Sequence, residues 1–114
     1  MSGKGTGLKH WRAQRLTAMA LAPLGLWFVY AIAALTGADY AAIHAWASQP
    51  LNALLLALFM AVMLRHALLG VEEVIQDYVH APCVKYGALM AARIATLVLL
   101  AVALIAIAVL AFGG

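Results

Sequence analysis

The sequence predicts an all-α membrane protein with three transmembrane helices. Of its 114 residues, 68% are hydrophobic and only 10% are charged, and the mean hydropathy is +1.02. An ordinary soluble domain carries roughly 25% charged residues and could not hide this much apolar surface from water. A soluble enzyme, a nucleic-acid-binding domain and a disordered chain are therefore excluded.

Three uncharged stretches, each of at least 20 residues, support this fold class: Leu16–Ala38, Ala45–Leu64 and Ile94–Gly114. Each is long enough to cross a hydrocarbon core of about 30 Å as a helix. We expect residues 10–114 to form one three-helix transmembrane anchor domain, with spans at about 16–38, 50–76 and 90–112. Residues 1–9 lack apolar periodicity and are expected to form a disordered tail.

Prolines mark the expected helix limits. Pro23 removes a hydrogen-bond donor and should kink the first span near Met19. Ser48 is expected to cap the second helix, with Pro50 in its first turn. Pro82 and Gly87 are expected to break the chain before the third span.

The basic residues predict the orientation. No Lys or Arg lies in the loop between the first two spans. The segment before the first span carries Lys4, Lys9, Arg12 and Arg15, and the region around the second loop carries Arg65, Lys85 and Arg93. The positive-inside rule then places the N-terminus in the cytoplasm and the C-terminus in the periplasm.

His66 is the candidate with the clearest chemistry, because it lies about 9 Å deeper along the second span than Glu72. An intramembrane histidine is costly unless it is paired. Three roles suit a neutral imidazole there: a proton relay, a hydrogen bond to a neighbouring helix, or an axial ligand to heme iron. Gly70, one turn further, leaves space for either a macrocycle or another helix, so this neighbour leaves the roles open.

Asp77 lies eleven residues after His66, which returns it to nearly the same helix face. Tyr78 follows it at the expected cytoplasmic interface. A tyrosine hydroxyl beside a carboxylate suits hydrogen bonding and proton transfer to a lipid-soluble quinone. Alternatively, the pair is a solvated helix end with Tyr78 as an interfacial anchor.

The segment His66-Ala-Leu-Leu-Gly70, followed by Val74-Ile-Gln-Asp-Tyr-Val79, resembles the H-x-x-x-G-x-x-x-V-I-x-D-Y-V motif of the small membrane-anchor subunit of succinate dehydrogenase (complex II). The opening around His10 to Ala18 and Pro23 to Trp27 is also similar to bacterial members. By this resemblance, His66 is one axial ligand of heme b. Tyr78 and Asp77 belong to the ubiquinone site, and Arg15 lies near the heme propionates or the quinone.

The resemblance also implies the partners. A larger anchor subunit, cytochrome b556, would supply the second heme ligand, and electrons would arrive through flavoprotein and iron–sulfur subunits. The chain carries no nucleotide loop, flavin motif or cysteine cluster, so we expect no independent catalysis; its one cysteine, Cys83, cannot form an internal disulfide.

Two alternatives stay open, a fumarate reductase anchor and a small holin-like pore-forming protein. The lack of an Arg- and Ser-rich leader favours the bacterial inner membrane over the mitochondrial one.

Overall fold

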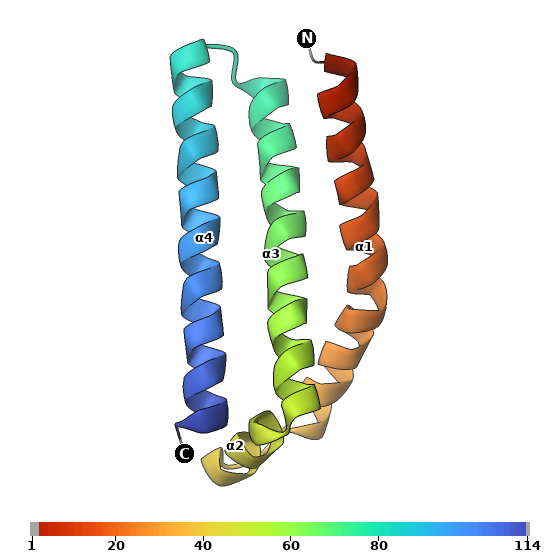
Figure 1. Cartoon of the computed structure of the whole chain (residues 1–114), viewed down its shortest axis with the longest axis vertical. Helices are drawn as coiled ribbons and strands as arrows, with labels where there is room; N and C mark the ends of the chain where they lie inside the picture. The colour runs from red at the N-terminus through yellow and green to blue at the C-terminus, as the bar shows by residue number, and fades with distance from the viewer. Residues whose placement is uncertain (1–2, 114) are drawn as a thin grey trace.

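The computed structural model describes residues 3–113, with side chains from residue 7 onward, and is helical throughout (Figure 1). Its helices are α1 (Gly3–Ala34), α2 (Tyr40–Ser48), α3 (Pro50–Tyr78) and α4 (Pro82–Phe112). Three of them, α1, α3 and α4, are long and apolar enough to cross a membrane. This confirms an all-helical protein with three spans.

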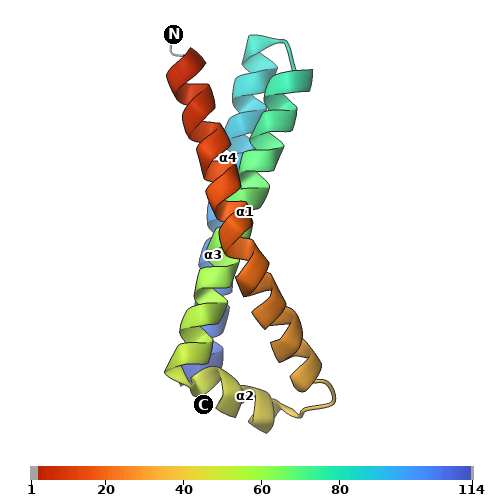
Figure 2. The same cartoon turned by 90° about the vertical axis from the view of Figure 1, so that its right-hand side faces the viewer.

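The three long helices are arranged with α3 between the other two. Within the described residues, α1 and α4 both pack on α3 but do not contact each other. Figure 2 shows α1 crossing α3 at an angle, so that the two helices diverge toward both ends. The N-terminus and the α3–α4 turn lie at one end of the molecule, whereas α2 and the C-terminus lie at the other (Figure 1).

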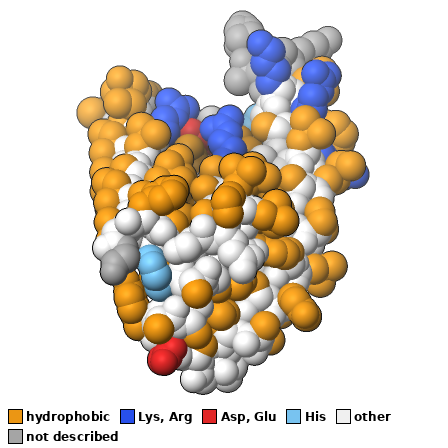
Figure 3. Space-filling view, turned by 60° about the horizontal axis from the view of Figure 1, so that its bottom comes forward, with side chains coloured by type: hydrophobic (Ala, Val, Ile, Leu, Met, Phe, Trp, Pro, Cys, Tyr) orange, Lys and Arg blue, Asp and Glu red, His pale blue; other side chains and the backbone are white. Residues whose placement is uncertain are grey.

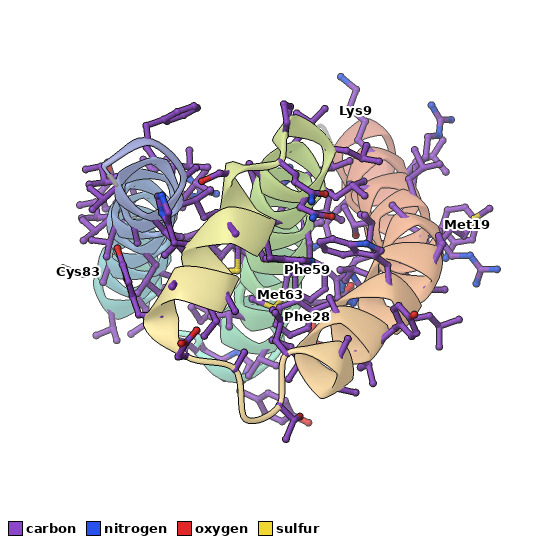
Figure 4. All side chains as sticks on the ribbon, turned by 90° about the horizontal axis from the view of Figure 1, so that it is seen from below. Lys9, Met19, Phe28, Phe59, Met63 and Cys83 are labelled. Carbon is purple, nitrogen blue, oxygen red and sulfur yellow. The ribbon has the colours of Figure 1, made fainter. Side chains whose placement is uncertain are left out.

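The interior of the chain is small. Most apolar side chains point outward, and the buried ones are few: Ala31, Ala47, Phe59, Leu68, Leu69 and Ala111. In lipid, apolar side chains gain little by hiding from solvent, so close packing and polar contacts hold the helices together. Between α1 and α3, the rings of Phe28 and Phe59 stack with centroids 4.5 Å apart, whereas Met19 points outward (Figure 4).

α1 differs from the expected first span at both ends. It already begins at Gly3, so residues 3–9 are helical where the sequence predicted a disordered tail, and residues 1–2 lie outside the described part. Each glycine there costs about 1 kcal/mol in a helix, but no proline interrupts the turns that extend from the apolar span. The helix ends at Ala34 rather than near residue 38, because Gly37 takes a φ of +81° and turns the chain.

A short helix, α2, fills most of the loop between the first two spans, which the sequence reasoning did not predict. Asp39 is its N-cap: the carboxylate oxygen Oδ1 accepts a hydrogen bond from the backbone N–H of Ala42 at 2.9 Å. Ser48 ends this helix instead of capping the next, so the expected role of Ser48 is wrong. Gln49 precedes α3, and Pro50 is the first residue of α3 as expected.

α4 begins at Pro82, earlier than the expected residue 90, so Pro82 and Gly87 do not break the chain before the span. A proline fits the first turn of a helix, since its missing N–H would have no intrahelical partner there. Gly87 lies inside α4, and a Cβ at this position would meet nothing within 4 Å. The helix therefore tolerates this glycine without needing it.

α2 packs against the end of α4 and supplies donors to its terminal carbonyls. Nδ1 of His44 donates to the carbonyl oxygen of Leu110. The hydroxyl of Ser48 lies 2.7 Å from the carbonyl oxygen of His44 in its own helix and 2.9 Å from the carbonyl oxygen of Ala111. The last carbonyls of a helix have no intrahelical donors. Side chains of α2, in the loop between the first two spans, thus lie against the last carbonyls of the third span.

Candidate functional site

A polar stripe on α1 faces α3. It consists of His10, Gln14 and Thr17, which are spaced four and three residues apart and so share one helix face. Nε2 of His10 donates to the backbone carbonyl of Leu69 at 3.0 Å. The stripe places three polar groups inside the interface between the first two spans, where unpaired polar groups are costly.

His66 meets this stripe. Its Nδ1 lies 2.8 Å from the hydroxyl oxygen of Thr17, and the histidine is half-buried between α1 and α3. Among the described residues, Nε2 of His66 has no hydrogen-bond partner. The imidazole is therefore anchored through one ring nitrogen, and the other remains free for a further ligand.

Gln14 and Gly70 lie next to this contact. A Cβ built on Gly70 would lie 3.9 Å from Nε2 of Gln14, which is an ordinary contact distance. The space beside Gly70 is thus occupied by α1 in this chain. The side-chain oxygen of Gln14 is buried without a hydrogen-bond partner among the described residues.

On the other side of α3, a buried carboxylate joins α3 to α4. Glu72 is only 6% exposed, and its Oε2 accepts a hydrogen bond from Nε of Arg93 at 2.7 Å. Glu73, which follows His66 by seven residues and so shares its helix face, is exposed. Next to the ion pair, Arg65 and Arg93 border an apolar groove of about 320 Å³ between the two helices.

The other predicted site residues are spread over the same end of the molecule. Tyr78 is the last residue of α3 and is 77% exposed, and the neighbouring Asp77 is also exposed. Arg15 is exposed on α1, and its guanidinium carbon lies 5.2 Å from the ring centroid of Trp11. Among the described residues, no hydrogen bond joins Arg15, Tyr78 or His66 to one another.

The sequence reasoning missed Thr17 and Glu72. The signal for Thr17 was the i, i+4, i+7 polar spacing on α1, and the signal for Glu72 was a charge nearly two turns past His66 inside an apolar helix. In the part of the chain that the structure describes, no group of three His, Cys, Asp or Glu side chains could hold a metal ion. A metal bound here by His66 would need ligands from outside this chain.

Three apolar spans with a half-buried histidine between the first two define a multi-pass membrane protein with a polar contact inside its helix bundle. The chain belongs to the family of succinate dehydrogenase/fumarate reductase transmembrane subunits, whose family model matches residues 1–112.

Curated relatives agree with this assignment. The chain is similar to the succinate dehydrogenase hydrophobic membrane anchor subunit of Rickettsia felis, with 34% identity over 79 residues, covering 69% of this chain and 66% of that protein. The corresponding subunit of Rickettsia bellii is 35% identical over 65% of this chain and 59% of its own length. The aligned stretch thus spans about two thirds or less of these relatives. No solved structure matches the chain.

The family answers one question that the sequence left open, since it favours a dehydrogenase-type anchor over a holin-like pore. With three spans and bacterial relatives, the chain is a multi-pass protein of the bacterial inner membrane.

Proposed function

We propose that this chain is the small membrane anchor of a succinate:ubiquinone oxidoreductase. It docks the flavoprotein and iron–sulfur subunits, shares heme b with a larger anchor subunit of the cytochrome b556 type, and forms part of the ubiquinone site. The observation that carries the proposal is His66, an imidazole inside a span with Nδ1 hydrogen-bonded and Nε2 free. The curated relatives favour succinate oxidation over the reverse reaction, because each is a succinate dehydrogenase subunit.

The donor set of this chain fits one side of a heme. His66 would provide one nitrogen ligand, and the second ligand of the heme would come from the partner subunit. Bound there, heme b supplies a one-electron carrier within the bilayer. The task of this chain is to hold the imidazole in place and to keep water from it with the apolar wall of α3, which includes Phe59 and Met63 (Figure 4).

The end of α3 suits a quinone, which takes up two protons on reduction and must be reached from both lipid and water. Tyr78 offers an exposed hydroxyl to a quinone carbonyl, and Asp77 next to it can accept protons from the aqueous side. Both groups are open in the isolated chain, so the iron–sulfur and larger anchor subunits would close the pocket over them.

The orientation is part of the proposal, with the N-terminus in the cytoplasm and the C-terminus in the periplasm. Figure 3 shows Lys and Arg side chains gathered at one end of the apolar surface and an acidic side chain at the opposite end. Arg12 and Lys85 lie in the first part of α1 and the first turn of α4, at the same end as Tyr78, the last residue of α3. The dehydrogenase subunits would therefore dock on the basic, cytoplasmic end.

His66→Ala in the assembled complex tests heme ligation. Loss of the nitrogen ligand should abolish the low-spin bis-histidine signal in the absorption and electron paramagnetic resonance spectra. His44→Ala, at the opposite end of the molecule, is the matched control and should keep the signal. An unchanged low-spin signal in the His66 variant would refute the ligation.

Tyr78→Phe tests the quinone site separately. It removes the hydroxyl and keeps the ring, so we expect quinone reduction to fall by about 5- to 150-fold, the equivalent of 1 to 3 kcal/mol. Succinate oxidation with an artificial dye should stay normal. Tyr86→Phe, an exposed tyrosine in the first turns of α4, is the control. If quinone and dye activities both stay normal in the Tyr78 variant, this residue is only an interfacial anchor.

A further inference from the structure

We infer that Thr17 is a positioning residue for the heme ligand: its hydroxyl accepts a hydrogen bond from Nδ1–H of His66 and thereby presents the lone pair of Nε2 to the iron. The inference rests on the proposed function, since it assumes that His66 binds heme. It assigns a role to a second residue of α1, since the family resemblance implies a site role there for Arg15 alone.

The direction of the hydrogen bond follows from the surroundings of the hydroxyl. Oγ1 of Thr17 lies 2.8 Å from the carbonyl oxygen of Ala13 and 3.1 Å from that of Gln14. Carbonyl oxygens only accept, so either of them can take the single hydroxyl proton of Thr17. The lone pairs of the hydroxyl oxygen are then available to His66, and we assign the donor role in the 2.8 Å contact to its Nδ1–H.

This arrangement fixes the tautomer of the imidazole. A neutral histidine carries one ring proton, and with that proton on Nδ1 the other nitrogen, Nε2, holds a free lone pair. Histidine ligands of metals commonly donate their other N–H to an acceptor, which orients the ring and raises its basicity. In this chain the acceptor comes from the first span, not from the helix that carries the ligand.

A stronger imidazole donor stabilises ferric over ferrous iron. Removing the acceptor should therefore shift the heme midpoint potential to more positive values. Thr17→Val keeps the shape of the side chain and lacks the oxygen, whereas Thr17→Ser keeps the hydroxyl. Thr96→Val is the matched control, because the Thr96 hydroxyl also bonds the carbonyl four residues back, that of Ala92, at 2.8 Å, but lies on α4 away from His66.

The test is a redox titration and an electron paramagnetic resonance spectrum of heme b in the assembled complex, with heme content measured alongside. We expect Thr17→Val to raise the potential or to lower the heme content, and Thr17→Ser and Thr96→Val to match the wild type. Wild-type potential and heme content in Thr17→Val would overturn the inference. The same change in Thr17→Ser as in Thr17→Val would also overturn it, since packing would then be the cause.

Failure of the proposed function would look different. In that case His66→Ala would keep the bis-histidine heme signal, whatever the Thr17 variants do. If His66→Ala loses heme while Thr17→Val keeps the wild-type potential, the assignment of His66 as heme ligand stands and only the role of Thr17 is refuted.

Discussion

Breaking the ion pair between Glu72 and Arg93 should have unequal effects, depending on which partner is removed. The Glu72 side chain is 7% exposed and the Arg93 side chain 51% exposed. Arg93→Gln leaves a buried carboxylate without its cation, whereas Glu72→Gln leaves a half-exposed guanidinium that can reach water or lipid headgroups. The first change should therefore be the more destabilising.

The magnitudes follow from the burial. Losing the cation from a buried pair costs about 3–5 kcal/mol in a dry interior, and the half-exposure of Arg93 reduces this to roughly 2–3 kcal/mol. Glu72→Gln keeps an oxygen that accepts the 2.7 Å hydrogen bond, so its cost is about 1 kcal/mol. The double variant should cost less than the sum of the two, by about 1 kcal/mol.

These values can be measured by unfolding the full chain in mixed micelles with increasing SDS. The stacked rings of Trp27 and Trp46, with centroids 6.0 Å apart, provide a fluorescence signal. Arg65→Gln is the control, because this arginine borders the same groove but lacks the ion pair, and it should change stability by less than about 0.5 kcal/mol. Equal and additive costs for Glu72→Gln and Arg93→Gln would refute the reasoning.

Three further predictions concern packing and orientation. Ser48→Ala should destabilise the chain by about 1 kcal/mol and raise amide exchange at the end of α4, since it removes a hydroxyl that lies within hydrogen-bond distance of both the His44 carbonyl, at 2.7 Å, and the Ala111 carbonyl, at 2.9 Å; unchanged exchange there would contradict this. Phe59→Ala should cost about 1–2 kcal/mol in the same SDS titration, because it removes the stacking with Phe28, and Phe59→Leu should cost less. A periplasm-specific reporter joined to the C-terminus should be active, and cytoplasmic activity would show the opposite orientation.

The spans could be predicted from the sequence because lipid imposes a length and a composition on them. The limits of α3 came within two residues of the structure, since Pro50 and the charged residues after His66 mark its ends. The start of α4 was missed because a proline is compatible with both a break and a first helical turn, and only packing decides between them. α2 was missed because its N-cap, Asp39, opens a helix of only nine residues.

The position of His66 could be predicted in the same way, but its hydrogen-bond partner could not. The depth of the residue and its helix follow from hydropathy, but the partner of Nδ1 depends on which face of α1 packs against α3. Thr17 lies 49 positions away from His66 in the sequence. The same limit applies to Glu72, because helix periodicity from His66 selects Glu73 as the neighbour on that face and does not report that α4 covers the other side.

The side-by-side order of the spans has a consequence for motion. Within the described residues α1 does not contact α4; it is held by its crossing with α3 and by the stacking of Trp27 on Trp46 of α2, so a change in its tilt would leave the α3–α4 pair in place. A change in the tilt of α1 lengthens or shortens the bond between Thr17 and His66 without bending the helix that carries the ligand. A subunit bound to the outer face of α1 would therefore act on the hydrogen bond of His66 through the tilt of the neighbouring helix.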